Sequence, residues 1–196
     1  MSREALIERQ TTETNIRLKV DLDGSGTWQG SSGIPFFDHL LGQMARHGLL
    51  DLKVWAEGDL EVDNHHTVED IGICLGQAVK KALGDKKGIS RYGSALVPMD
   101  EALVLVALDF SGRPYLAWGL ELPPGRIGSL ETELVEEFLR AMVNNSGLTL
   151  HVRQLAGHNA HHLAEALFKA LGRAIRQAVT LDPRVQGIPS TKGSLS

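Results

Sequence analysis

The chain has 196 residues, of which 42% are hydrophobic, and this is ordinary for a globular protein with one large core or two small ones. Its net charge of -4 provides no basic field for nucleic acid or an anionic membrane. The single cysteine, Cys74, cannot form an internal disulfide, and the longest apolar run, residues 102–108, is too short to span a bilayer. With no apolar signal segment at the N-terminus, we expect a cytoplasmic protein without membrane or nucleic-acid partners.

The first half of the chain is expected to contain strands and two helices. Residues 20–26 lead into a Ser-Gly pair, which is typical of a strand that runs into a turn. A helix is expected at residues 40–44, followed by a strand at residues 52–54. In residues 65–82 the apolar side chains recur three and four positions apart, which predicts an amphipathic helix.

The second half repeats this order. Residues 161–178 match residues 65–82 at an offset of 96, and seven of the 18 pairs are identical. The expected strand at residues 20–26 matches residues 106–112 at an offset of 86. At an offset of 98 the helix expected at residues 40–44 matches a segment that contains Phe138, Leu139 and Met142. At the same offset the strand expected at residues 52–54 matches residues 150–152.

Each half therefore reads strand, strand, helix, strand, helix. We expect an α+β protein with halves at residues 1–92 and 93–183, packed as one compact unit with helices on one face of each sheet. Residues 184–196 form an arm. The Pro, Gly and Ser content of residues 182–196 would by itself suggest disorder.

Both long helices are expected to begin with a His-His pair and a glutamate. His65 and Glu69 lie one turn apart, as do His161 and Glu165, so each pair shares a helix face and can hold one cation. An isolated pair of this kind is usually a surface feature, but two copies in register favour metal sites. The structural alternative is that duplication retained them only as polar groups at the helix N-termini.

The second histidine of each pair, His66 or His162, projects about 100° away from the first. We expect each to complete the metal site of the opposite half about a pseudo-twofold axis, giving two sites with ligands from both halves. His39 aligns with Glu137 at the offset of 98, so these are candidate equivalent ligands, one for each metal. Imidazole and carboxylate without thiolate favour manganese or iron over structural zinc, and zinc stays open.

Five motifs connect these residues to a known family. They are residues 37–41 (Phe-Asp-His-Leu-Leu), 63–70 (Asp-Asn-His-His-Thr-Val-Glu-Asp), 111–115 (Ser-Gly-Arg-Pro-Tyr), 159–166 (Asn-Ala-His-His-Leu-Ala-Glu-Ala) and 189–193 (Pro-Ser-Thr-Lys-Gly). Over nearly its whole length the chain resembles imidazoleglycerol-phosphate dehydratases. The resemblance implies a duplicated fold like domain 2 of ribosomal protein S5, two Mn²⁺ ions per active site and a homo-oligomer of 24 subunits.

The resemblance also implies the reaction and the site residues. The reaction is dehydration of D-erythro-imidazoleglycerol phosphate to imidazoleacetol phosphate in histidine biosynthesis. The metal ligands would be His39, His65, His66, Glu69, His161, His162 and Glu165, with Glu137 at a position where many family members have histidine. The substrate contacts would be Glu13, Gln43, Arg91, Arg113, Lys169, Ser190 and Lys192.

The substrate phosphate is expected to meet the basic members of this set and Ser190. Guanidinium and ammonium groups form charge-assisted hydrogen bonds to phosphate oxygens. Ser190 and Lys192 would order the arm over the ligand, on a neighbouring subunit, so that activity depends on the assembly.

Dehydration must remove a carbon-bound proton that no carbonyl acidifies. Our hypothesis is that both ring nitrogens bind metal, so that the substrate is held as an imidazolate and expels its hydroxyl through a diazafulvene-like intermediate. Glu13 is the expected proton-transfer residue and Asp100 a secondary candidate, although Glu13 alone reads as an exposed glutamate of an edge strand. Glu69 and Glu165 are expected to take part in catalysis as metal-binding carboxylates.

Two alternative functions stay open on the residues alone. The first is a hydrolase that uses water activated by two metals, because similar ligands would serve it. The second is a non-enzymatic metal-binding shell in which the ions join the two halves. The second alternative leaves Arg113, Lys169 and the Ser-x-Lys arm without a role.

Overall fold

The first half of the chain forms a four-stranded sheet with strand order β1-β2-β4-β3. The computed structural model describes residues 2–195. The elements of the first half are β1 (Glu4–Gln10), β2 (Thr14–Asp21), β3 (Trp28–Ser31), α1 (Pro35–Gly48), β4 (Asp51–Gly58) and α2 (His65–Leu83). In β2, Ile16, Leu18 and Val20 are buried and the residues between them are not, which is the alternation of a sheet covered on one face.

The second half repeats this arrangement with strand order β5-β6-β10-β7. Its elements are β5 (Tyr92–Met99), β6 (Ala102–Asp109), β7 (Tyr115–Ala117), β8 (Arg126–Ile127), β9 (Leu130–Glu131), α3 (Leu134–Ser146), β10 (Thr149–Ala156) and α4 (Ala160–Val179). Strand β7 runs parallel to β10, as β3 runs parallel to β4. The β8–β9 hairpin forms a separate two-stranded sheet, and the elements described in the first half include no counterpart of it.

The predicted duplicated α+β fold is confirmed, and the structure adds strands that the periodicity did not predict. Strands β3 and β7 have four and three residues. Strands this short do not establish an alternating pattern in the sequence, because the pattern needs several residues to be distinguished from a loop. Their backbones pair only because β4 and β10 lie beside them.

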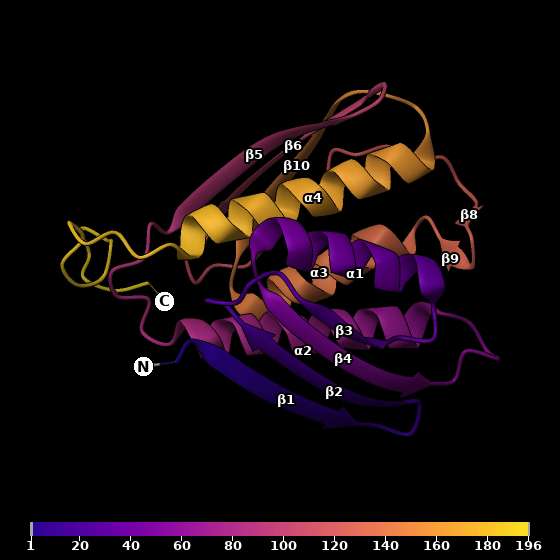
Figure 1. The fold of residues 1–196 in the computed structure, drawn as a ribbon, viewed down its shortest axis with the longest axis horizontal. Helices are drawn as coiled ribbons and strands as arrows, with labels where there is room; N and C mark the ends of the chain where they lie inside the picture. The colour runs from indigo at the N-terminus through magenta and orange to yellow at the C-terminus, as the bar shows by residue number, and fades with distance from the viewer. Residues whose placement is uncertain (1, 196) are drawn as a thin grey trace.

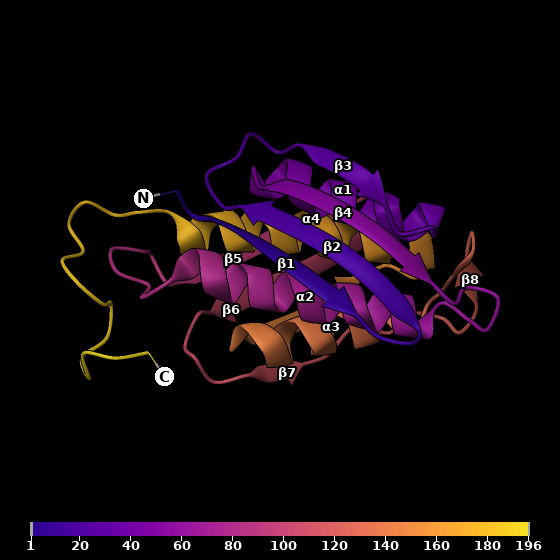
Figure 2. The same ribbon diagram turned by 90° about the horizontal axis from the view of Figure 1, so that it is seen from below.

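The four helices lie between the two sheets (Figures 1 and 2). Helices α1 and α2 cover one face of the first sheet, and α3 and α4 cover one face of the second. Between these layers α1 packs against α4 and α2 against α3, so each helix pair joins the two halves. No helix within residues 2–195 has the length and apolar character needed to cross a membrane.

The two contacts between halves are equivalent. A Cβ atom added to Gly172 in α4 would lie 2.3 Å from the carbonyl oxygen of Met44 in α1, and one added to Gly76 in α2 would lie 2.5 Å from that of Met142 in α3. These glycines match at the offset of 96 and the methionines at 98. The same close backbone approach thus occurs twice, which is the relation expected of a pseudo-twofold axis between the halves.

One carboxylate at the start of β4 holds the loop between β2 and β3. Asp51 Oδ1 accepts hydrogen bonds from the amides of Ser25 (2.8 Å), Gly26 (3.0 Å) and Thr27 (2.9 Å), and from the Thr27 hydroxyl. The hydroxyl and amide of Thr27, followed by the other amides, lower the pKa of Asp51 to about 2. The loop is therefore stabilised by an ionised carboxylate.

We expect Asp51→Asn to lower the free energy of unfolding by about 1 to 2 kcal/mol at pH 7, because the amide lacks the charge that strengthens these hydrogen bonds. The folded-state pKa lies below the unfolded value of about 3.9, so this stabilisation is present above that value and is lost as the pH falls toward about 2. Urea unfolding of both proteins at several pH values should show that the difference between their free energies of unfolding becomes smaller over that range. A difference independent of pH would contradict this account.

Candidate metal centre and substrate pocket

Glu165 is the centre of a polar cluster between α1 and α4. Its Oε1 lies 2.7 Å from His39 Nε2 and 3.0 Å from His161 Nε2, and its Oε2 accepts a hydrogen bond from Lys169 Nζ at 2.6 Å. The Glu165 side chain is only 8% exposed. Because α1 packs on α4, the cluster combines side chains from both halves of the chain.

The surroundings of Glu165 favour its ionised form. Burial by itself would raise the pKa of Glu165, but hydrogen bonds from Lys169, His39 and His161 outweigh burial and lower the pKa to about 2. The Phe36 ring lies 4.9 Å from that of His161, between centroids, and restricts its position. The cluster therefore presents a fixed anionic oxygen and two imidazole Nε2 atoms at one point.

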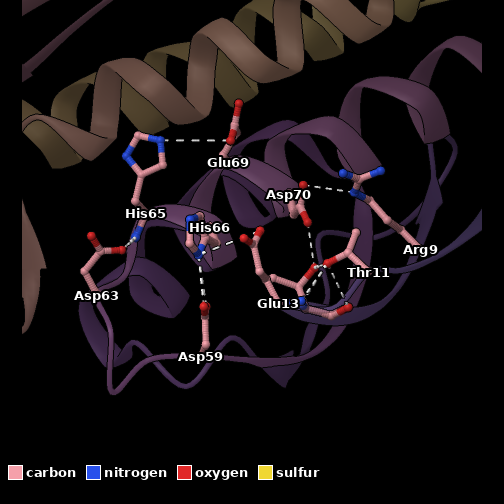
Figure 3. A network of polar contacts seen from close by, with 10 residues as sticks. Arg9, Thr11, Glu13, Asp59, Asp63, His65, His66, Glu69 and Asp70 are labelled. Carbon is pink, nitrogen blue, oxygen red and sulfur yellow. Dashed lines mark hydrogen bonds and ion pairs between the residues drawn. The ribbon is translucent and has the colours of Figure 1, made fainter.

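The equivalent cluster at the start of α2 is more open. His65 Nε2 lies 3.9 Å from Glu69 Oε2, on the shared helix face (Figure 3). Glu137, which aligns with His39, lies 3.8 Å from Arg140 on its own helix. These three candidate ligands thus lie on neighbouring helices, α2 of the first half and α3 of the second, without the tight contacts seen around Glu165.

The second histidine of each pair is held by a carboxylate. His66 Nδ1 lies 3.0 Å from Asp59 Oδ2, and His162 Nδ1 lies 2.7 Å from Glu101 Oε2. These hydrogen bonds raise the pKa of both histidines, with Asp59 and Glu101 as the respective main causes. When Nδ1 donates to a carboxylate, Nε2 keeps a lone pair and is oriented for a metal ion.

The two histidines of each pair diverge. The ring planes of His65 and His66 are 85° apart, as are those of His161 and His162. His66 faces Asp59 and Glu13 of its own half (Figure 3), so a single chain does not bring it to the opposite cluster as the pseudo-twofold hypothesis supposed. In the part of the chain that the structure describes, no three His, Cys, Asp or Glu side chains form a complete metal site.

The donors nevertheless fit a divalent cation. Neutral imidazole nitrogen and carboxylate oxygen, without thiolate, are the donors that Mn²⁺, Fe²⁺ and Zn²⁺ accept. In the Glu165 cluster these groups contact one another directly, at the point where they would otherwise bind a shared ion. Each chain therefore carries partial ligand sets rather than a closed metal cage.

Sequence reasoning missed the partners of the second histidines. Glu13 lies in the turn after β1, not within a strand, and its Oε2 is 3.9 Å from His66 Nδ1. The corresponding turn after β5 contains Asp100, which the repeat offset indicated, and Glu101, which makes the shorter contact to His162. The repeat offset therefore identified the correct turn and Asp100, but not the neighbouring Glu101, which holds His162 more closely. Asp59 lies in the loop after β4, where the repeat provides no signal.

Four of the five expected phosphate contacts line one cavity of about 730 Å³, namely Arg91, Arg113, Ser190 and Lys192. Its lining contains three cationic side chains and no acidic one, which suits an anionic group. Lys169 lies outside this cavity, beside Glu165. The side-chain Nε2 of Gln43 lies 3.3 Å from His39 Nε2. The expected substrate contacts are therefore divided between this cavity and the metal-ligand clusters.

The part of the arm that the structure describes, residues 184–195, lies on the cavity and includes no helix or strand. The Arg91 guanidinium forms two hydrogen bonds with the Asp109 carboxylate, at 2.7 and 3.0 Å, and a third with the Pro189 carbonyl at 2.9 Å. Buried Lys86 donates to the Leu195 carbonyl at 3.4 Å. These cations hydrogen-bond to two backbone carbonyls of the arm and thereby hold it against the cavity.

This cavity and the histidines lie at opposite ends of α4. The Arg91 amide donates to the carbonyl of Ala178, near the end of α4, whereas His161 is at its beginning. The 17 residue steps from His161 to Ala178 extend about 25 Å along the helix. Figure 1 shows the arm at one end of the molecule and the start of α4 at the other. A small substrate cannot reach both regions of the same chain.

Comparison with known proteins identifies the family. The family model described as imidazoleglycerol-phosphate dehydratase matches residues 32–175, which include both His-His-x-x-Glu motifs. The chain belongs to the imidazoleglycerol-phosphate dehydratase family. The resemblance found from the motifs is thereby confirmed.

Individual members of the family are similar to this chain over nearly their full lengths. The imidazoleglycerol-phosphate dehydratase of Moorella thermoacetica is 98% identical over 196 residues and that of Desulforamulus reducens 60% identical over 195, each covering 100% of both chains. A crystal structure of the Staphylococcus aureus dehydratase matches with a TM-score of 0.83 at 38% identity, covering 91% of this chain and 99% of that one. The Pyrococcus furiosus family member, solved in complex with (S)-C348, gives 0.82 at 37% identity, covering 96% and 100%.

Proposed function

We propose that this chain dehydrates imidazoleglycerol phosphate with two divalent ions per active site, Mn²⁺ in our expectation, at sites completed by neighbouring copies. The reaction follows from family membership, which makes the chain a hydro-lyase of histidine biosynthesis. A two-metal hydrolase and a non-enzymatic shell are not retained, because the family's reaction is a dehydration. The metal, the residue roles and the assembly are the proposed parts.

The observation that carries the metal proposal is the convergence of His39 and His161 Nε2 on one Glu165 oxygen. These three side chains would hold one ion, and His65, Glu69 and Glu137 would hold the other. His66 and His162, whose Nδ1 atoms are held by Asp59 and Glu101, would use their Nε2 atoms to complete the sites of neighbouring copies. When bound, the ions would withdraw charge from the imidazole ring of the substrate and lower its pKa.

The chain's own residues would bind the phosphate and move the proton. Arg91, Arg113 and Lys192 would neutralise the phosphate in the 730 Å³ cavity, with the Ser190 hydroxyl as an additional donor. Glu13 is exposed at the β1–β2 turn, where its carboxylate is free to accept the carbon-bound proton. Replacing Glu13 by Gln would remove this base, and full turnover in that variant would refute the role.

The 25 Å separation along α4 supports assembly. If the cavity of one chain cannot serve the histidines of the same chain, a second copy must bring its own cavity to them. We therefore propose a closed homo-oligomer, with 24 subunits as the expected number, in which the arm of one copy covers the metal ions of another. The assembly would then be a condition of activity and not only of stability.

Chelation tests the metal part of this proposal. We expect metal analysis of the purified protein to find about two divalent ions per site, and dehydration of imidazoleglycerol phosphate to stop after their removal. Addition of Mn²⁺ should restore turnover. Full activity in protein that metal analysis shows to be empty would refute the proposed role of the ions.

A further inference from the structure

The β8–β9 hairpin is the largest departure from the repeat. Among the described elements it has no counterpart in the first half. Its base is closed by two hydrogen bonds of Thr132, from its amide to the Gly125 carbonyl at 2.9 Å and from its hydroxyl to the Pro123 carbonyl at 2.9 Å. Leu130 is buried, so the hairpin is anchored to the body of the protein. In Figure 1 it lies at the end of the molecule where α4 begins.

A second departure from the repeat lies directly against this hairpin. Asp63 and Asn159 occupy matching positions before the two long helices, and their side chains accept hydrogen bonds from the His65 amide at 2.8 Å and from the His161 amide at 2.9 Å; Asn159 also accepts from the His162 amide. The following residue differs, because Asn64 in the first half aligns with Ala160 in the second. The side chain of Asn64 makes no capping hydrogen bond.

Asn64 instead joins α2 to the hairpin. Its Nδ2 donates to the carbonyl of Ser129 at 2.6 Å and to Glu131 Oε2 at 2.8 Å. The other oxygen of Glu131 is held by Arg126, 2.5 Å away, so the acceptor itself is fixed. Asn64 is replaced by alanine at the matching position of the second half, and the hairpin has no counterpart among the elements described in the first half. These two unmatched features contact each other. The contact between them therefore acts on the start of α2 and not on the start of α4.

The hairpin also lies beside the other ligand cluster. A Cβ atom added to Gly128, at its tip, would be 3.6 Å from Phe36 Cβ. Phe36 in turn lies 4.9 Å from the ring of His161 and 6.0 Å from that of His39, between centroids. One short element thus hydrogen-bonds to the residue before His65 and passes close to Phe36, whose ring lies beside His161.

We infer that the β8–β9 hairpin positions the metal ligands, with Asn64 and Glu131 as positioning residues that fix the start of α2 and hence the donors of His65 and Glu69. The need is greatest there, because the 3.9 Å separation of His65 from Glu69 lacks the short contacts that hold the Glu165 cluster. The inference rests on the proposed metal function. It assigns to Asn64 and Glu131 a role that acts through the ligands, without contact to substrate.

The test is Mn²⁺ affinity of the full assembled protein after chelation, measured by the electron paramagnetic resonance signal of free Mn²⁺. We expect Asn64→Ala and Glu131→Ala each to weaken binding at one class of site at least about 10-fold, the range found for residues that orient metal ligands. Glu131→Gln keeps an acceptor for Asn64 and should bind nearly as the parent does. The double variant Asn64→Ala/Glu131→Ala should bind Mn²⁺ no more weakly than Asn64→Ala alone, because Glu131 acts through Asn64.

A control variant and a thermal measurement separate this role from general stability. Glu121→Gln removes an exposed charge from the segment between β7 and β8 and leaves the link between Asn64 and Glu131 intact, so it should leave the affinity unchanged. A merely structural role would lower the thermal midpoint of metal-free and loaded protein alike. A positioning role instead reduces the increase in midpoint that Mn²⁺ produces.

The outcomes distinguish the inference from the function on which it rests. Parent protein that binds no Mn²⁺ would overturn the proposed metal centre and this inference with it. Parent protein that binds Mn²⁺, together with parent-like affinity in Asn64→Ala and Glu131→Ala, would overturn the inference alone.

Discussion

Glu165→Gln should weaken Mn²⁺ binding more than about 100-fold and reduce dehydration correspondingly, because a ligand is more sensitive than the groups that orient it, whose loss costs about 10- to 100-fold. The substitution keeps the size of the side chain but removes the charge that faces His39, His161 and Lys169. Calorimetric titration of the metal-free protein with Mn²⁺, together with turnover at saturating metal, measures both effects.

Glu4→Gln is a matched control for this experiment. It removes one negative charge from an exposed position at the start of β1, the end of that strand remote from the turn that contains Glu13. We expect unchanged metal affinity and turnover in this variant. Circular dichroism of both variants checks that the fold is intact, since Glu165 is buried and its loss leaves Lys169 unpaired. Tight Mn²⁺ binding by folded Glu165→Gln would refute its assignment as a ligand.

Two inactive variants should restore activity to each other when they assemble together. Arg113→Ala removes a cation from the phosphate cavity, and Glu165→Gln disrupts the metal cluster about 25 Å away along α4. If each site combines the cavity of one copy with the cluster of another, a mixed assembly contains sites in which both parts are intact. Random mixing of equal amounts gives roughly one quarter of such sites.

The measurement is turnover of the co-assembled variants, relative to each variant alone and to a mixture of the two homogeneous assemblies that do not exchange subunits. We expect about a quarter of parental activity in the first and almost none in the others. Absence of restored activity in assemblies shown to contain both variants would mean that one chain supplies a whole site. The 25 Å separation would then have to close by a change of conformation.

The repeat made the fold predictable from the sequence. Glycines 76 and 172 occupy matching positions in the periodic pattern, and the structure shows why, since each allows one helix to contact the backbone of another. The hydrophobic periodicity similarly identified the long helices, because burial of one face imposes a pattern over many residues. Strands β3 and β7 were missed because their pairing depends on β4 and β10, not on their own few residues.

The candidate site was predictable in part. The i,i+4 spacing placed His161 beside Glu165 and His65 near Glu69, as helix geometry requires. It did not predict that Asp59 and Glu101 hold the second histidines, because these carboxylates lie in loops whose course depends on the whole half. Nor did it predict the link between Asn64 and Glu131, which are 67 residues apart.

What the sequence alone determined is the inventory: a duplicated α+β unit, the paired imidazoles and carboxylates, and the motifs that place the chain in its family. Periodicity and fixed spacing along a helix depend on local geometry, and local geometry can be read from consecutive residues. The tertiary structure decided where these groups lie relative to one another. It places the cavity lined by cationic side chains and the histidines at opposite ends of α4. That separation arises from the packing of helices between two sheets, which cannot be read from any short stretch of sequence.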